Sequence, residues 1–171
     1  MSQASNHIEW CLNKAKKEIE ECKKAGKRLK HRGLLKGEPD IAEAKNHLVK
    51  AQHNFIGITR FKEFGFSDWS MSAGFYCIYH CFLAIAAKFG YDSGNQTCTI
   101  ALMRYLKEEK KINLDEKFIE LLEYEEINSV IDMREDYTYG VQISVKDEAR
   151  LDELKDVCKE LIDIVKGIVF G

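Results

Sequence analysis

Residues 66–90 constrain the fold of this chain more than any other segment, because they are apolar on nearly every side of a helix. A helix without a polar face must be buried on several sides by other elements. Ser67 or Asp68 is expected to cap its start, and Gly90 is expected to end it in the left-handed conformation. The segment is therefore predicted to be the central helix of a bundle.

Apolar residues that recur every three or four positions predict further helices on both sides of this segment. These helices are expected at residues 6–30, 40–65, 98–110, 114–137 (with a break near 125–129) and 147–166. The first two are expected to form a hairpin, with the start of the second capped by Asp40, and Asn95 or Thr97 is expected to cap the helix after the central one. A loop or short extended piece is expected at residues 138–145. We predict an all-α, antiparallel bundle of five to seven helices. It forms a single domain over residues 1–171, with residues 1–38 as an N-terminal helical extension.

The sequence has no run of 18 apolar residues, and its first ten residues lack the apolar core of a signal peptide. We therefore expect no membrane association and a cytoplasmic location. Six cysteines occur without the regular spacing of a disulfide framework, and in a reducing compartment they are expected to be free and partly buried. They are Cys11, Cys22, Cys77, Cys81, Cys98 and Cys158.

Positive charge is concentrated near the N-terminus, although the whole chain has a net charge of −2. Seven basic residues and no acidic residue lie between positions 22 and 37, and Lys27, Arg28 and Lys30 are the candidates among them for contact with RNA phosphates. The alternative is a solvated helix end, where cations are favoured by the helix dipole.

The central segment and the helix after it resemble a HEPN domain. The resemblance is carried by Ala73, Tyr76, Tyr79, His80, Leu83, Ala84 and Gly90, and by the apolar residues 98–106, and it covers roughly residues 42–170. HEPN proteins are small helical bundles that are often paired with a minimal nucleotidyltransferase. The resemblance implies a nucleotide- or RNA-associated protein that partners such an enzyme in a two-component, toxin–antitoxin-like system. A homodimer is expected as well, because the central and last helices offer more apolar surface than one bundle covers.

Ribonuclease members of the HEPN group carry an arginine that is followed after four to six residues by a histidine. Arg134 matches the arginine, but the histidine position falls on Tyr139, Gly140 or Val141. Tyrosine titrates near ~10 and is a poor proton shuttle at neutral pH. Arg134 with Asp136 and Tyr137 resembles instead a HEPN branch with an Arg-x-Asp-Tyr pattern. Little or no ribonuclease activity is therefore expected.

Three readings of Arg134 remain open from the sequence. It can pair with Asp136, Glu63 or another carboxylate at a helix junction, as a buried arginine must. It can contact the phosphates of a nucleotide or RNA together with Asp136 and Tyr137. In the third reading it is the catalytic residue of a metal-independent endoribonuclease, with Tyr139 or His80 as a weak substitute for the histidine.

Tyr76, Tyr79 and His80 are candidates for stacking on bases, and His80 for carrying a proton. A lone histidine in an apolar helix is more often a hydrogen-bonded core residue. Cys77 and Cys81 flank His80, but His80 is offset from Cys81 by ~100° around the helix. No metal site and no cofactor are expected. A protein-interaction module that touches no nucleotide is a further alternative.

Overall fold

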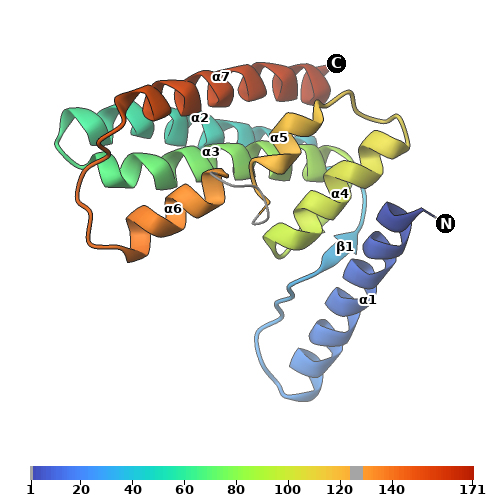
Figure 1. Cartoon of the computed structure of the whole chain (residues 1–171). Helices are drawn as coiled ribbons and strands as arrows, with labels where there is room; N and C mark the ends of the chain where they lie inside the picture. The colour runs from blue at the N-terminus through green and yellow to red at the C-terminus, as the bar shows by residue number, and fades with distance from the viewer. Residues whose placement is uncertain (1, 124–128) are drawn as a thin grey trace.

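The computed structural model describes residues 2–123 and 129–171, and within them the chain forms seven helices and one small two-stranded sheet (Figure 1). The predicted all-α bundle is confirmed. In chain order the elements are α1 (Gln3–Lys24), β1 (Leu34–Lys36), α2 (Ile41–Glu63), α3 (Ser67–Lys88), β2 (Tyr91–Ser93), α4 (Gln96–Glu108), α5 (Glu116–Glu120), α6 (Val130–Tyr139) and α7 (Glu148–Phe170).

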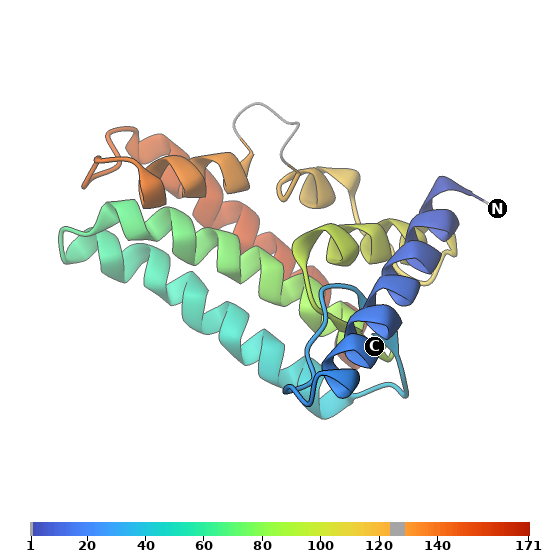
Figure 2. The ribbon, with the colours of Figure 1, turned by 90° about the horizontal axis from the view of Figure 1, so that it is seen from below.

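Helix α3 is the centre of the bundle, as the sequence predicts. Fifteen of its 22 residues are buried, and α2, α4, α6 and α7 all pack against it (Figure 2). Within the described residues it is the one helix long and apolar enough to cross a membrane, but 78% of its most apolar window is buried inside the protein. Its apolar character is therefore accounted for by its place in the core.

The helix ends follow the predicted caps in part. The side chains of Asp40 and Asn95 accept hydrogen bonds from first-turn N–H groups of α2 and α4, and Gly90 has a φ of +76°. The prediction that Ser67 or Asp68 caps α3 is wrong, because the helix begins at Ser67 itself. The hydroxyl of Ser67 is buried and accepts instead from the backbone N–H of Val145 at 2.8 Å, which holds the loop before α7.

Helices α1 and α2 do not form the predicted hairpin. Helix α1 packs against α4 and β1, and β1 pairs antiparallel with β2, with Leu34 opposite Ser93. The turn that ends α1 contains Gly26, whose φ is +61°, so the helix stops at Lys24 and not near residue 30. The pairing of β1 with β2 then carries the chain into α2. The predicted break at residues 125–129 lies mostly outside the described residues, but Ser129 caps α6.

Two of the six cysteines form a disulfide. Cys11 of α1 and Cys98 of α4 are bonded, with their Cα atoms 5.9 Å apart and both side chains fully buried. The prediction that every thiol is free is therefore wrong for this pair. The two residues are 87 positions apart and belong to helices that meet only in the folded chain. Cys22, Cys77, Cys81 and Cys158 are free, as predicted.

Candidate functional site

The site begins where α6 packs on α3. The guanidinium of Arg134 lies over the ring of Phe75, with its Cζ atom 4.6 Å from the ring centroid. Cation–π contact of this kind holds an arginine in place when both partners are shielded from water. The Arg134 side chain is 15% exposed, and Phe75 is 5% exposed. Sequence reasoning missed Phe75, because one more aromatic residue in an apolar helix gives no signal of its own.

Arg134 has an incomplete set of hydrogen-bond partners within the described chain. Its Nη2 donates to Oε1 of Glu135 at 3.3 Å, while its Nε is buried and meets no acceptor in that part of the protein. Of the carboxylates named from the sequence, Glu63 pairs with Arg60 and Asp136 is exposed, so the carboxylate that pairs with Arg134 is that of Glu135. A buried donor without an acceptor is costly, so the hydrogen-bonding capacity of this guanidinium is only partly used within the described chain.

The aromatic candidates on α3 join this arginine through Phe75. Its ring meets Tyr76 edge-on at 5.1 Å and stacks with Tyr79 at 6.0 Å, and Tyr79 in turn meets His80 at 6.4 Å. Tyr76 is 44% exposed and so offers part of its ring to solvent. Burial raises the pKa of Tyr79, and its phenol therefore stays protonated at neutral pH. The structure thus brings Arg134, Tyr76 and Tyr79 together around one ring.

His80 is committed to another partner. Its Nδ1 is 3.0 Å from Nδ1 of His47 on α2, and His47 Nε2 is 3.5 Å from a carboxylate oxygen of Glu43. Burial, and then the charges of His47 and Lys50, lower the pKa of His80 to about 4. Burial also lowers the pKa of His47, against the opposing effect of Glu43 and Asp92. Both rings are neutral at pH 7, where one donates to the other and joins α2 to α3.

Because of the His47–His80 pair, the protein is expected to become less stable in mild acid. Histidines with an ordinary pKa near 6.5 take up protons in the unfolded chain before the folded pair does, which favours unfolding. The contribution of this pair to the free energy of unfolding should therefore be complete above pH 6.5 and should be lost as the pH falls towards about 4. Urea titrations across this range should show a weaker pH dependence in a His47→Asn/His80→Asn variant, whereas a His53→Asn control on the exposed side of α2 should keep it. Equal slopes in all three proteins would contradict the assignment.

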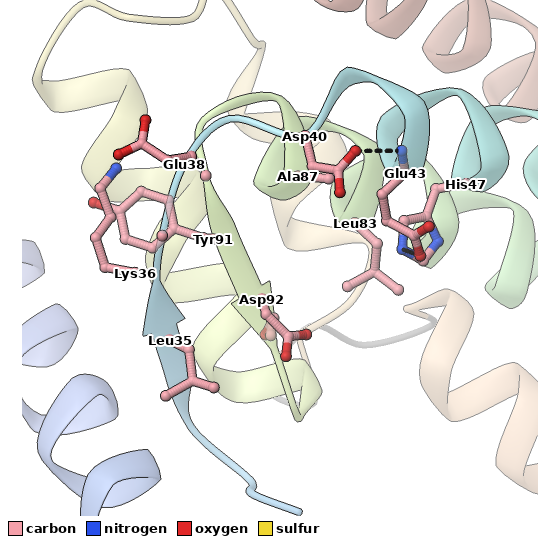
Figure 3. A pocket seen from close by; sticks show the side chains of 13 residues that line it. Leu35, Lys36, Glu38, Asp40, Glu43, His47, Leu83, Ala87, Tyr91 and Asp92 are labelled. Carbon is pink, nitrogen blue, oxygen red and sulfur yellow. Dashed lines mark hydrogen bonds and ion pairs between the residues drawn. The ribbon is translucent and has the colours of Figure 1, made fainter.

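A pocket of about 580 Å³ opens beside His47, between the β1–β2 sheet and the first turns of α2 (Figure 3). Carboxylates dominate its polar lining: Glu38, Asp40, Glu43 and Asp92. Lys36 also lines it, but its ammonium lies 3.9 Å from the centroid of the Tyr91 ring and donates to the Phe89 carbonyl oxygen. The charge of this pocket repels phosphate. Within the described residues, no group of three or more His, Cys, Asp or Glu side chains is placed to hold a metal ion.

The remaining candidates on α6 lie apart from the arginine. Tyr139 is the last residue of the helix and is 76% exposed, and a five-residue step turns it ~140° from Arg134 around the axis. Asp136 is exposed, whereas Tyr137 is partly buried and packs on the core. Within the described residues, no hydrogen bond or ring contact joins Arg134 to Tyr139 or His80. Tyr139 and His80, the two proton carriers considered from the sequence, therefore lie apart from Arg134 within the described part of one chain.

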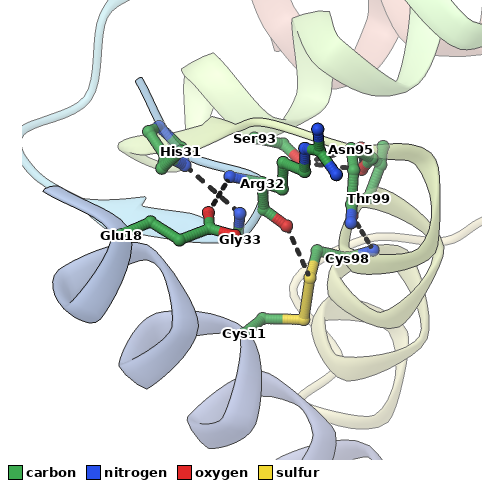
Figure 4. The surroundings of a disulfide bond; sticks show 9 residues. All are labelled: Cys11, Glu18, His31, Arg32, Gly33, Ser93, Asn95, Cys98 and Thr99. Atoms are coloured by element: carbon green, nitrogen blue, oxygen red, sulfur yellow. Dashed lines mark hydrogen bonds between the residues drawn. A yellow bond between two sulfur atoms is a disulfide. The ribbon is translucent and has the colours of Figure 1, made fainter. Parts of the chain in front are cut away.

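The basic residues form a second candidate surface. Lys27, Arg28 and Lys30 are all exposed in the segment that leads from α1 to β1. This segment reaches away from α6 (Figure 1), and it is held by the backbone N–H of Arg32, which donates to the carboxylate of Glu18 (Figure 4). Lys27 and Lys30 line a pocket of about 580 Å³ at its base. The basic segment is therefore exposed and anchored at one end.

No protein-family model matches the chain, and no curated protein matches it.

Proposed function

We propose that this chain is a HEPN-like helical protein that binds the phosphates of RNA or of a nucleotide without cleaving RNA. In this proposal it serves as the partner of a minimal nucleotidyltransferase in a two-component, toxin–antitoxin-like system. The resemblance of residues 42–170 to HEPN domains supplies the partner and the ligand class. The bundle architecture is compatible with that resemblance.

The observation that carries the proposal is the state of Arg134. Packing on Phe75 fixes its guanidinium, and its Nε is buried without an acceptor in the described chain. The side chain as a whole is 15% exposed, and a phosphate that reaches the guanidinium would add the charge-assisted hydrogen bonds that the described chain does not supply. Tyr76, beside the same ring and partly exposed, offers a face on which a base can stack.

Binding without cleavage is supported by the position of the possible proton carriers. A general acid or base contributes roughly 10²–10⁴-fold to such a reaction and must lie within hydrogen-bond reach of the group that it protonates. Tyr139 is 76% exposed and lies ~140° around α6 from Arg134, and His80 is hydrogen-bonded to His47 with its pKa lowered to about 4. The endoribonuclease alternative finds no support in these positions.

Fluorescence anisotropy with a labelled single-stranded RNA tests the proposal. Arg134→Ala is expected to weaken binding about 10-fold, since the lost charge-assisted bonds contribute ~1.5 kcal/mol or more. Arg134→Lys keeps the positive charge but not the planar guanidinium, and its affinity for the RNA should lie between those of the wild type and of Arg134→Ala. Arg60→Ala removes a matched positive charge from the surface of α2 and should leave the affinity nearly unchanged.

A Lys27→Glu/Arg28→Glu/Lys30→Glu variant in the same assay separates the two surfaces. If the basic segment contacts RNA, this variant should bind weakly and show a shallower dependence of affinity on salt, whereas Arg134→Ala should change the slope by one phosphate contact at most. Unchanged binding by Arg134→Ala, with circular dichroism showing an intact fold, would refute the role of Arg134. Metal-independent cleavage by the wild type that Arg134→Ala abolishes would establish the endoribonuclease instead.

A further inference from the structure

One end of the bundle exposes a cluster of large apolar side chains. They lie at the α2–α3 turn with the helix ends on either side of it, and at the end of α6 with the loop that follows, and between 40% and 97% of each residue is exposed. We call this set the apolar end: Phe61, Phe64, Phe66, Trp69, Tyr139, Val141 and Ile143. Half of all the large hydrophobic residues exposed in the described chain belong to it.

Polar contacts hold the two segments of the apolar end together. The N–H of Val145 donates to Oγ of Ser67 at 2.8 Å, and Lys62 forms an ion pair with Glu148 at 3.2 Å. The hydroxyls of Ser72 and Thr138 lie 3.1 Å apart where α6 ends on α3. Figures 1 and 2 both show the α2–α3 turn beside the α6–α7 loop. The two segments that carry the apolar end are therefore neighbours in the fold, although its residues come from positions up to 82 apart in the sequence (Phe61 and Ile143).

The size of this surface suits a stable protein interface. A large aromatic side chain accounts for about 150–250 Å², so the exposed parts of the seven residues add up to roughly 800 Å². Each partner contributes about the same area to an interface of standard size. Contiguous apolar patches on a monomer are usually smaller, at about 300–600 Å².

The charges around the apolar end favour a second copy as the occupant. Arg60, Lys62 and Lys146 lie among Glu63, Asp68, Asp147 and Glu148, so both signs surround the same apolar centre. A surface with interspersed signs can face a copy of itself across a two-fold axis, with acids opposite bases. An anionic lipid surface or a nucleic acid would instead call for an excess of positive charge.

We propose that the apolar end is the interface through which two copies of this chain form a two-fold dimer. From the sequence, the surplus apolar surface was expected on the central and last helices. In the structure α7 leaves only Phe170 among its large hydrophobic residues strongly exposed, and the surplus lies at the opposite end of that helix. The proposal is independent of phosphate binding by Arg134, because that guanidinium contacts Phe75 and Glu135, and neither belongs to the apolar end.

Light scattering on the eluate of a size-exclusion column tests the dimer. The wild type is expected at twice the 19.7 kDa of one chain, and a Phe64→Glu/Val141→Glu variant is expected at 19.7 kDa. Burying two carboxylates per subunit in an apolar interface should weaken the dimer at least ~100-fold. Leu29→Glu and Phe170→Glu place the same charge on exposed hydrophobic residues outside the apolar end, and both controls should remain dimeric.

Cross-linking locates the interface directly. A Val141→Cys variant should form a disulfide between subunits under mild oxidation, whereas a Leu29→Cys control should not, and both substitutions are on exposed residues that tolerate change. A monomeric wild type at high micromolar concentration would overturn the proposal. So would a Phe64→Glu/Val141→Glu variant that folds, by circular dichroism, and remains a dimer.

Discussion

Replacing both Cys11 and Cys98 with alanine is expected to lower the free energy of unfolding by about 4 kcal/mol, because the disulfide closes a loop across 87 residues of sequence. Cross-linking two points this far apart removes many conformations from the unfolded chain. The two sulfur atoms are buried where α1 packs on α4 (Figure 4), so replacing both cysteines with alanine also removes a small amount of packing. Urea unfolding of the two proteins under oxidising conditions measures the difference.

A Cys22→Ala variant is the matched control, since Cys22 is a free, half-buried cysteine at the end of the same helix. It should unfold close to the wild type. Addition of a dithiol reductant should lower the stability of the wild type and of Cys22→Ala, and should not affect the double variant. Thiol titration in denaturant without reductant should find four reactive groups in the wild type, and six would contradict the disulfide.

The disulfide matters most for α1, which is weakly held otherwise. Only Ala4, Ile8, Cys11 and Ala15 of its 22 residues are buried. Four buried side chains compensate for little of the conformational entropy that the segment loses when it is held in place as a helix. Amide hydrogen exchange should therefore accelerate in α1 of the double variant before it changes in α3.

The sequence predicted the bundle because its main signals are local. The apolar character of α3 and the caps at Asp40 and Asn95 depend on residues within one or two helical turns. The failures concern contacts between distant segments. The spacing of apolar residues shows which side of a helix is buried, but not which helix packs against that side. It therefore could not predict that α1 packs on α4 or that a disulfide joins them.

The candidate site shows the same division. The sequence singled out Arg134, Tyr76, Tyr79 and His80, and three of these meet around Phe75. His80 binds His47 instead, and the i, i+4 pair of Glu43 and His47 on α2 was the available sequence signal for that partner. The apolar end could not be predicted, because a turn and a loop that contribute exposed aromatics look unrelated until the structure brings them together.

Gly74 is expected to be required for the close packing of α3 against α7. A Cβ atom at this position would lie 2.7 Å from Cγ and 2.9 Å from Cδ1 of Leu154 on α7, and nearer still to Cδ2. Leu154 is 4% exposed and has little room to move. Gly74→Ala should therefore destabilise the protein by roughly 1–3 kcal/mol through overpacking, although alanine is the better helix former.

A double-mutant cycle identifies the cause. Leu154→Ala alone should cost about 2–5 kcal/mol through the cavity that it leaves, and the added methyl group of Gly74→Ala should then fit into that space. The double variant should consequently be less destabilised than the sum of the single variants. Gly57→Ala is the control, because its Cβ atom would meet Ala73 at an ordinary 3.5 Å, and it should stabilise α2 by up to ~1 kcal/mol. Additive losses in the cycle would mean that Gly74 is needed for a reason other than contact with Leu154. A coupling energy of about 1 kcal/mol or more between positions 74 and 154, as expected when a clash with one methyl group is relieved, would show that α7 packs this closely on α3 because residue 74 is glycine.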